Sequence, residues 1–172
     1  AGYNGIKMCL ATAAPIGADS GLDEIKRMAM AGPDPSGSRG SRTERDMLAG
    51  YVEHVHSFVD LSAMKPLKVV ADTANGMGGL VLPAVFADLP FELDHLFPEL
   101  DGTFPNHPAD PIQPENQKDL CDRLLSIGAD VGLAFDGDAD RVFLVDETAR
   151  PISGSLTTAL VARSIHEREP GA

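Results

Sequence analysis

The sequence predicts an α/β fold: a three-layer α/β/α sandwich with a mixed, mostly parallel four-stranded sheet and an antiparallel edge hairpin. Two observations support this class. Between residues 67 and 135, three short strand-like runs alternate with two segments of helical periodicity, an order typical of parallel strands joined by right-handed crossovers. Only six residues then separate Phe135 from Val142. This connection is too short for a crossover, so the third and fourth strands are expected to form a hairpin.

Helices are expected ahead of this sheet. Asp19 or Ser20 is a suitable N-cap for a helix that ends near Gly32. Residues 32–41 are dense in Gly, Pro and Ser, which is the composition of a flexible linker. Residues 42–59 resume helical spacing and are expected to form a lead-in helix. The apolar face of the first helix consists of Leu22, Ile25 and Met28.

The sheet region begins at residue 67. Pro83 is compatible with the first helix of this region only if it lies in the first turn, where backbone amides lack helical acceptors. Residues 97–113 are Pro-rich and longer than a passive connection, which favours a functional loop. Strands are predicted at residues 67–72, 91–96, 131–135 and 142–145, and helices at residues 80–89, 114–127 and 154–167, the last with Leu156, Leu160 and Ile165 facing inward.

The composition excludes several classes of partner. The chain carries 14 Lys and Arg against 26 Asp and Glu, a net charge of −12, which disfavours binding to nucleic acid or to a membrane surface. No apolar run approaches the roughly 18 residues of a membrane span. Cys9 and Cys121 match no disulfide or zinc spacing. We therefore expect a cytoplasmic protein.

The hairpin connection is a candidate metal site. Asp136, Asp138 and Asp140 alternate with the small residues Gly137 and Ala139, so the loop can curl until the three carboxylates converge. Without a cation this clustering of like charges is unfavourable. Hard oxygen ligands select Mg²⁺, Mn²⁺ or Ca²⁺. The next residue, Arg141, is well placed to hold a phosphate that the metal also contacts.

Two other interpretations of this loop stay open. An EF-hand-like calcium module requires Asp at loop positions one, three and five and Glu at twelve, which the chain satisfies through Glu147. Its glycine at position six is replaced by Arg141, and strands rather than helices are expected to flank the loop. A solvated acidic hairpin tip is the simpler alternative.

The glycines that follow the first strand allow a Rossmann-like nucleotide-binding domain. Gly76 and Gly78 begin a G-x-G-x-x-G frame, but its last position is Val81. A tight strand-to-helix turn explains these glycines without a ligand. The five histidines show no metal-binding spacing and are expected to have ordinary surface or core roles.

The sequence resembles the α-D-phosphohexomutase superfamily, the phosphoglucomutase and phosphomannomutase enzymes. Three motifs carry the resemblance in the same order as in the second domain of that family: residues 69–79 (VVADTANGMGG), residues 104–108 (FPNHP) and residues 136–141 (DGDADR). The segment Tyr3-Asn4-Gly5-Ile6-Lys7 resembles the stretch that follows the phosphoserine motif of the family. The match extends over about residues 51–162.

The resemblance implies a domain organisation for the chain. Residues 1–41 would be the end of the phosphoserine-carrying first domain with a linker. Residues 42–154 would be the metal-binding second domain, and residues 155–172 the start of the third. The phosphoserine itself, and the later domains that recognise the sugar and its phosphate, would lie outside these residues, so the chain alone is expected to be inactive.

The resemblance also implies a chemistry. The family transfers a phosphoryl group reversibly on mannose or glucose phosphates, between the 1- and 6-positions, through a bisphosphorylated sugar intermediate. Mg²⁺ would bridge the phosphoserine to Asp136, Asp138 and Asp140. Lys7 would be an acid/base or charge-stabilising group beside the phosphoserine, and Arg141 a phosphate-facing catalytic residue.

Overall fold

The structure is a computed structural model that describes residues 5–32 and 40–171. The chain divides into two units, Ala1–Arg45 and Asp46–Ala172. Among the described residues, no helix has both the length and the apolar character needed to cross a membrane. Tyr3, Asn4 and most of the expected linker, residues 33–39, lie outside the described residues.

The first unit has little buried surface. It contains the short 3₁₀ helices η1 (Ala11–Ala13) and η2 (Ala18–Ser20), the helix α1 (Leu22–Ala31), and an isolated antiparallel bridge between Cys9 and Pro15. The expected helix is confirmed, but its expected cap is wrong. Asp19 and Ser20 belong to η2. The residue that precedes α1 is Gly21, whose non-helical φ of 128° separates the two helices.

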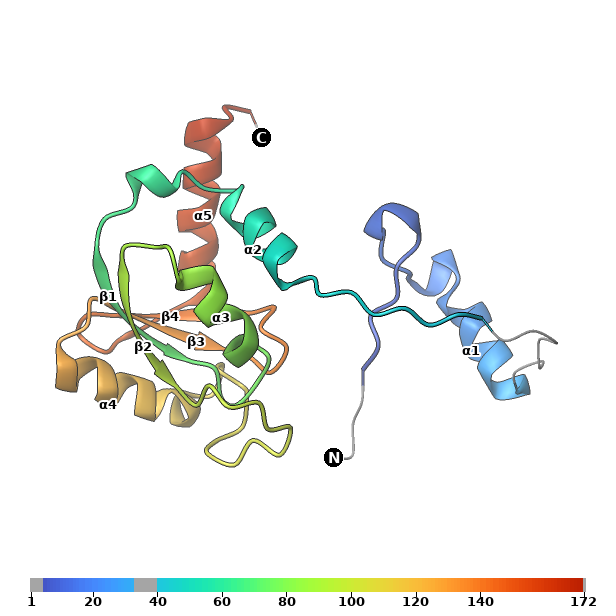
Figure 1. Ribbon diagram of the computed structural model, residues 1–172, viewed down its shortest axis with the longest axis horizontal. Coiled ribbons are helices and arrows are strands. Elements are labelled where there is room, and N and C mark those ends of the chain that lie inside the picture. The colour runs from blue at the N-terminus through green and yellow to red at the C-terminus, as the bar shows by residue number, and fades with distance from the viewer. Residues whose placement is uncertain (1–4, 33–39, 172) are drawn as a thin grey trace. The chain divides into compact units, whose positions relative to one another are not determined.

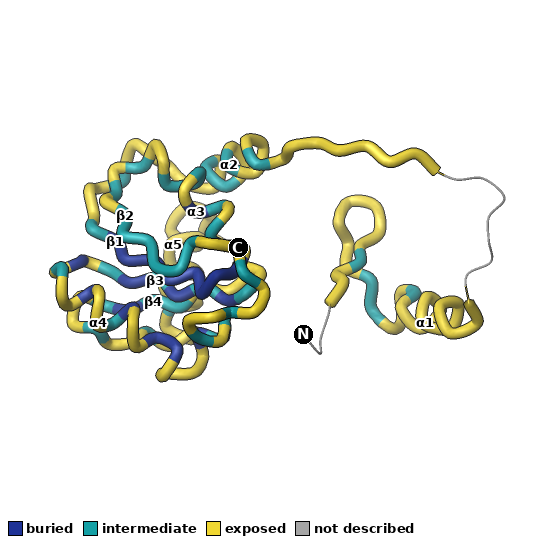
Figure 2. The backbone as a smooth tube through the Cα atoms, turned by 60° about the horizontal axis from the view of Figure 1, so that its bottom comes forward, coloured by how far each residue is buried: buried dark blue, intermediate teal, exposed yellow. Residues whose placement is uncertain are grey.

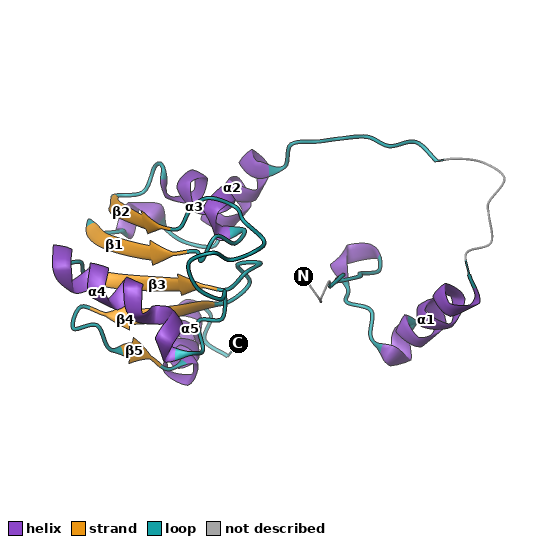
Figure 3. Cartoon of the chain, turned by 90° about the horizontal axis from the view of Figure 1, so that it is seen from below, coloured by secondary structure: helices purple, strands orange, loops and turns teal. Residues whose placement is uncertain are grey.

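The second unit is built on a mixed five-stranded sheet with the order β2-β1-β3-β4-β5 (Figures 1 and 3). β1 pairs in parallel with both β2 and β3, whereas β3–β4 and β4–β5 are antiparallel. The α/β class, the mixed sheet and the hairpin are confirmed. The strands are β1 (Leu67–Asp72), β2 (Phe91–Leu96), β3 (Val131–Phe135), β4 (Val142–Asp146) and β5 (Pro151–Ile152).

The fifth strand corrects the expected count of four. β5 pairs Ile152 with Leu144 and Pro151 with Val145, so it replaces the β3–β4 hairpin as the edge of the sheet. Its two residues are too few for a sequence pattern, and its proline has no backbone N–H to donate. Proline is tolerated in strands mainly at such an edge, where no further strand needs that donor.

Helices cover both faces of the sheet. α4 lies on one face, and α2, α3 and α5 lie on the other (Figures 1 and 3). Within the sheet, burial is most continuous in β1, where residues 69–72 are all buried (Figure 2). The helices are α2 (Leu48–His56), α3 (Gly78–Phe86), α4 (Lys118–Ile127) and α5 (Gly154–Arg168), with 3₁₀ helices η3 (Leu61–Ala63) and η4 (Pro114–Gln117).

The fully buried core lies between α4 and the sheet. Leu120 and Leu124 of α4 pack with Val70 of β1 and Val145 of β4, and all four are 0% exposed. A Cβ atom on Gly132 of β3 would lie 3.1 Å from both Leu124 and Val145. The small residue at this position therefore lets the helix pack closely on the sheet.

Two expectations for the other face were wrong. Pro83 is the sixth residue of α3, beyond the first turn, because the helix begins at Gly78 rather than at Leu80. The apolar stripe of α5 does not face inward: Leu156, Leu160 and Ile165 are 40 to 52% exposed.

Candidate metal centre

The acidic loop lies where β3 ends. Since β1 and β3 are parallel, with Asp72 beside Ala134, the carboxyl ends of both strands meet at one edge of the sheet. Asp136, Asp138 and Asp140 each offer a carboxylate oxygen, and these oxygens lie within 4.8 Å of one another. Asp136 is 2% exposed, whereas the other two aspartates are exposed. The structure thus brings the three carboxylates together, with one anchored in the protein and two toward solvent.

Hydrogen bonds across the hairpin hold Asp136. The Nε of Arg141 donates to Asp136 Oδ2 at 2.7 Å, and its backbone N–H donates to Asp136 Oδ1 at 3.1 Å. The guanidinium also approaches Asp140 Oδ1 at 3.6 Å. These contacts, the bond to Asp136 foremost, raise the pKa of Arg141. Arg141 is therefore a permanent positive charge beside the carboxylates.

The backbone of the loop makes a tight turn. Ala139 adopts a φ of 59°, and its N–H donates to the Asp136 carbonyl at 3.1 Å. A positive φ is uncommon for a residue with a Cβ, and alanine is the smallest such residue. The turn brings the side chains on its two sides, Asp138 and Asp140, toward Asp136.

This donor set fits a divalent cation. Three carboxylates in six residues are accompanied by one arginine, so the loop retains negative charge after the ion pair is counted. Carboxylate oxygens suit Mg²⁺, Mn²⁺ or Ca²⁺ better than zinc or copper. The loop is flanked by β3 and β4, not by the two helices of an EF-hand.

The glycine-rich turn after β1 packs against this loop. The Met77 N–H donates to the Gly137 carbonyl at 2.9 Å, and a Cβ on Gly76 would lie 2.7 Å from the same oxygen. A Cβ on Gly79 would lie 2.0 Å from the Pro98 carbonyl. Close approaches within the chain thus account for these glycines, as the turn interpretation proposed, without a nucleotide.

The Pro-rich segment 97–113 lies on the other side of the loop. A Cβ added to Gly137 would lie 3.4 Å from the ring of Phe104 and 3.5 Å from the Cβ of Ala109. A pocket of about 160 Å³ opens here between the glycine-rich turn, this segment and Gly137. The segment is therefore part of the wall of the site, a position consistent with the functional loop expected from its length.

Sequence reasoning missed a contact at the same edge, between the buried Asp72 and the half-buried His107. His107 Nε2 lies 3.0 Å from Asp72 Oδ2, and its Nδ1 lies 2.9 Å from the Pro108 carbonyl oxygen. Asp72 is 2% exposed, and burial raises the pKa of its carboxyl, although His107 opposes this shift. Asp72 ends a parallel strand and His107 lies in the long loop, a combination that could have indicated their contact.

Of the five expected site residues, the structure brings four together: Asp136, Asp138, Asp140 and Arg141. Lys7 is an exposed residue of the first unit. Its expected role beside a phosphoserine stays a prediction.

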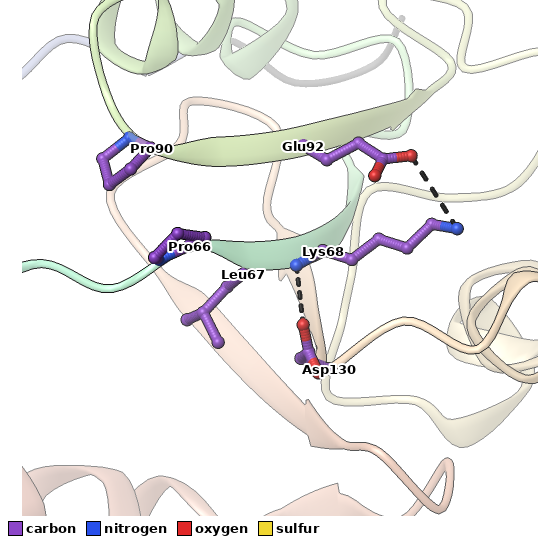
Figure 4. Close-up of a pocket in the computed structure, with 6 residues that line it drawn as sticks. All are labelled: Pro66, Leu67, Lys68, Pro90, Glu92 and Asp130. Carbon is purple, nitrogen blue, oxygen red and sulfur yellow. Dashed lines mark hydrogen bonds and ion pairs between the residues drawn. The ribbon is translucent and has the colours of Figure 1, made fainter.

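A larger pocket, of about 310 Å³, lies at the opposite end of the strands (Figure 4). The Lys68 N–H donates to Asp130 Oδ2 at 2.7 Å, and Lys68 Nζ lies 3.7 Å from Glu92. In this pocket the Lys68 ammonium thus faces the Glu92 carboxylate, and the Asp130 carboxylate is held by a backbone amide. It gathers no group of three metal-ligating side chains, whereas among the described residues the loop at 136–140 does.

Comparisons with known proteins agree on one family. The family described as "Phosphoglucomutase/phosphomannomutase, alpha/beta/alpha domain II" has a sequence model that matches residues 49–150. The chain is 39% identical over 173 residues to a Xanthomonas campestris pv. campestris protein named "Phosphohexose mutases", covering 98% of the chain and 38% of that protein. It is 37% identical over 178 residues to a Salmonella montevideo phosphomannomutase, covering 99% of the chain and 39% of the relative.

Solved structures give the same result. A phosphoglucomutase/phosphomannomutase family protein from Burkholderia thailandensis superposes with a TM-score of 0.79 at 36% identity, over 87% of this chain and 33% of that one. The chain spans less than two fifths of the length of these relatives. Domain-wide sequence match, fold and relatives converge: the chain belongs to the phosphoglucomutase/phosphomannomutase family of enzymes.

Proposed function

We propose that the chain supplies the Mg²⁺-binding domain of a phosphohexomutase, which moves a phosphoryl group reversibly between the 1- and 6-positions of mannose or glucose phosphates. One observation carries the proposal. Three carboxylates converge at the end of β3 in a chain whose relatives are named phosphomannomutase and phosphoglucomutase. Residues 42–154 would form this domain, residues 1–41 the end of a phosphoserine-carrying domain, and residues 155–172 the start of a third.

The aspartates would hold the metal ion. Asp136 is fixed by the Arg141 backbone N–H and guanidinium, so its carboxylate is oriented before binding. Asp138 and Asp140 present their oxygens from the exposed part of the turn. A bound Mg²⁺ would neutralise negative charge that develops during phosphoryl transfer.

The cationic residues would act on the phosphate. Arg141 lies next to the carboxylates and its side chain is 55% exposed, so its remaining N–H donors can bind a phosphate oxygen of the sugar or of the bisphosphorylated intermediate. Lys7 would donate a proton or stabilise charge beside the phosphoserine. Both roles require substrate and protein segments beyond those described.

Calorimetric titration with Mg²⁺ tests the metal assignment. We expect the wild-type chain to bind Mg²⁺ and Asp138→Asn to bind it at least about tenfold more weakly, because a ligand charge is lost. Asp122→Asn, on the exposed surface of α4, is the matched control and is expected to behave as wild type. Equal heats for wild type and Asp138→Asn would contradict the assignment.

The same titration discriminates against a calcium module. A regulatory EF-hand-like site would bind Ca²⁺ with a strong preference over Mg²⁺. We expect no such preference, since strands flank the loop and Arg141 occupies the position of the EF-hand glycine.

A coupled mutase assay tests the whole-enzyme proposal. We expect no turnover from the 172-residue chain alone, because it spans only 38 to 39% of the relatives that carry the mutase names. Turnover by the purified chain would show that these residues suffice for catalysis.

A further inference from the structure

Gly76 is a glycine for reasons of contact, not of backbone conformation. Its φ lies outside the left-handed region that favours glycine. A Cβ at this position would instead lie 2.7 Å from the Gly137 carbonyl oxygen and 3.0 Å from the Gly137 Cα. Both are backbone atoms, which cannot rotate away as the end of a side chain can. Any larger residue at position 76 must therefore displace Gly137.

Gly137 connects two of the three carboxylates. It follows Asp136 and precedes Asp138, so the orientation of its peptide groups sets where the second carboxylate points relative to the first. Its carbonyl accepts the Met77 N–H at 2.9 Å. On the opposite side, a Cβ added to Gly137 would be in van der Waals contact with Phe104 and Ala109. The residue is thus held between the glycine-rich turn and the Pro-rich segment.

Asn75 ties the turn to that segment with its backbone and side chain. Its N–H donates to the Phe97 carbonyl at 3.0 Å and its Nδ2 to the Glu99 carbonyl at 2.9 Å. Its Oδ1 accepts from Asn106 Nδ2 at 2.7 Å, and its carbonyl accepts the Asp101 N–H at 2.9 Å. All these partners belong to one segment, so Asn75 fixes the turn against the wall of the site.

The turn is strained, and this network compensates for the strain. Ala74 and Asn75 have φ values of 48° and 62°, a conformation that costs residues with a Cβ roughly a kcal/mol or more each. Both are buried, at 1% and 4% exposure. Such strain persists only where surrounding contacts determine the backbone. Here those contacts are the bonds of Asn75 to the Pro-rich segment, and the residues that follow, Gly76 and Met77, contact the Gly137 peptide of the acidic loop.

We propose that Gly76 and Asn75 are positioning residues for the metal site: the turn holds the Gly137 peptide and thereby sets the separation of the Asp136 and Asp138 carboxylates. This inference rests on the proposed function, in which the loop binds a divalent cation. Neither residue belongs to the three carboxylates that would hold the cation. Each acts through the backbone of the loop.

Gly76→Ala tests the proposal against a matched control. We expect its affinity for Mg²⁺, measured by calorimetry on the full chain, to fall by about tenfold or more, the effect typical of changes behind the ligands. Gly102→Ala is the control. Gly102 lines the same pocket, has no positive φ, and a Cβ on it would meet nothing within 4 Å, so its affinity is expected to equal that of wild type.

A second variant keeps the test informative if Gly76→Ala does not fold. Asn75→Gly retains the left-handed backbone without strain but removes the bonds to Glu99 and Asn106. We expect it to fold and to bind Mg²⁺ more weakly than wild type, and to show faster hydrogen exchange at the Met77 amide in the absence of metal. A residue with a purely structural role would lower stability yet leave the affinity of the folded protein unchanged.

The outcomes separate the two proposals. Wild-type affinity in folded Gly76→Ala and Asn75→Gly, with a wild type that binds Mg²⁺, would overturn the positioning role alone. A wild type that produces no binding heat would overturn the metal assignment and this inference with it. Weaker binding by either variant, with Gly102→Ala unchanged, would support the positioning role.

Discussion

The two ends of the parallel strands differ in how their charges are neutralised. At the amino ends, Lys68 lies between Asp130 and Glu92, and the pocket around them, about 310 Å³, is about twice as large as the pocket at the carboxyl ends, about 160 Å³. At the carboxyl ends, three carboxylates share one arginine. The larger cavity thus holds two carboxylates, one facing the Lys68 ammonium and one bonded to the Lys68 backbone N–H, whereas the smaller one adjoins three carboxylates that share one guanidinium.

This difference shows that pocket size is a poor guide to chemistry in this fold. Two carboxylates that lie apart and each face a donor of the chain gain less from binding an ion than three that converge. A cluster of like charges is destabilised until an opposite charge arrives, so the carboxyl edge should respond to cations and the amino edge should not. The following variants examine that contrast.

The largest expected effect is on stabilisation by Mg²⁺. At about 100 times its dissociation constant, an ion that binds only the folded state raises the free energy of unfolding by about 2.7 kcal/mol. We expect this gain in wild type and in Asp130→Asn, and its loss in Asp136→Asn, when urea unfolding is measured with and without Mg²⁺. Equal gains in both variants would remove the contrast between the two edges.

A smaller effect is expected from Asp130→Ala in the absence of metal. The change removes the acceptor of the Lys68 N–H, and the loss of one such hydrogen bond costs about 1 kcal/mol of the free energy of unfolding. Urea unfolding measures this loss. The Mg²⁺ affinity is expected to stay at the wild-type value; a change as large as that of Asp136→Asn would mean that the two edges are coupled.

Asp72→Asn is expected to change the pH dependence of stability more than stability itself. Burial raises the pKa of Asp72 above its ordinary value of 3.8, against the opposing effect of His107, and Asp119 adds to the increase. A raised pKa means that the protonated carboxyl stabilises the fold below about pH 4, and that this contribution is lost as the pH rises through the raised pKa. The asparagine does not titrate.

The measurement compares unfolding free energies of wild type and Asp72→Asn from about pH 4 to about pH 7. Wild type is expected to lose stability relative to the variant as the pH rises. The change at the low end should be below about 1 kcal/mol, because asparagine can still accept the Ala74 N–H and donate to His107. Parallel pH profiles would contradict a raised pKa of Asp72.

Glu92→Gln is expected to have the smallest effect. The Glu92 side chain is 76% exposed and lies 3.7 Å from Lys68 Nζ, and exposed pairs of this kind contribute below about 0.5 kcal/mol. Thermal unfolding at low and moderate salt should barely separate the variant from wild type. A larger loss would mean that the charge pairing at the amino edge is a main source of stability.

Local patterns predicted much of this fold. The bounds of β1, β2 and β3 agree with the predicted runs at residues 67–72, 91–96 and 131–135, because each run is ended by residues that favour turns or loops. The acidic loop was also visible, since its spacing is contained in six residues. β5 was missed because a two-residue strand that starts with proline has no pattern of its own.

Contacts between distant segments could not be predicted in the same way. The pairing of Asp72 with His107, and of Gly76 with Gly137, depends on the register of β1 against β3 and on the path of residues 97–113. The prediction that the apolar stripe of α5 faces inward was wrong for a related reason. Helical periodicity identifies an apolar face, but not whether another segment covers it.

The arrangement of the sheet also bears on the order of folding. β3 and β4 are neighbours in sequence and pair through a short turn, whereas β1 meets β3 only after two helices and a strand have intervened. Closing the longer loop costs more entropy and is slower. The acidic turn can therefore form early. Gly76 and Met77, which contact it, follow β1 and reach it only when β1 pairs with β3. In refolding experiments, metal binding would then appear at the rate of β1–β3 pairing rather than at the faster rate of β3–β4 hairpin formation.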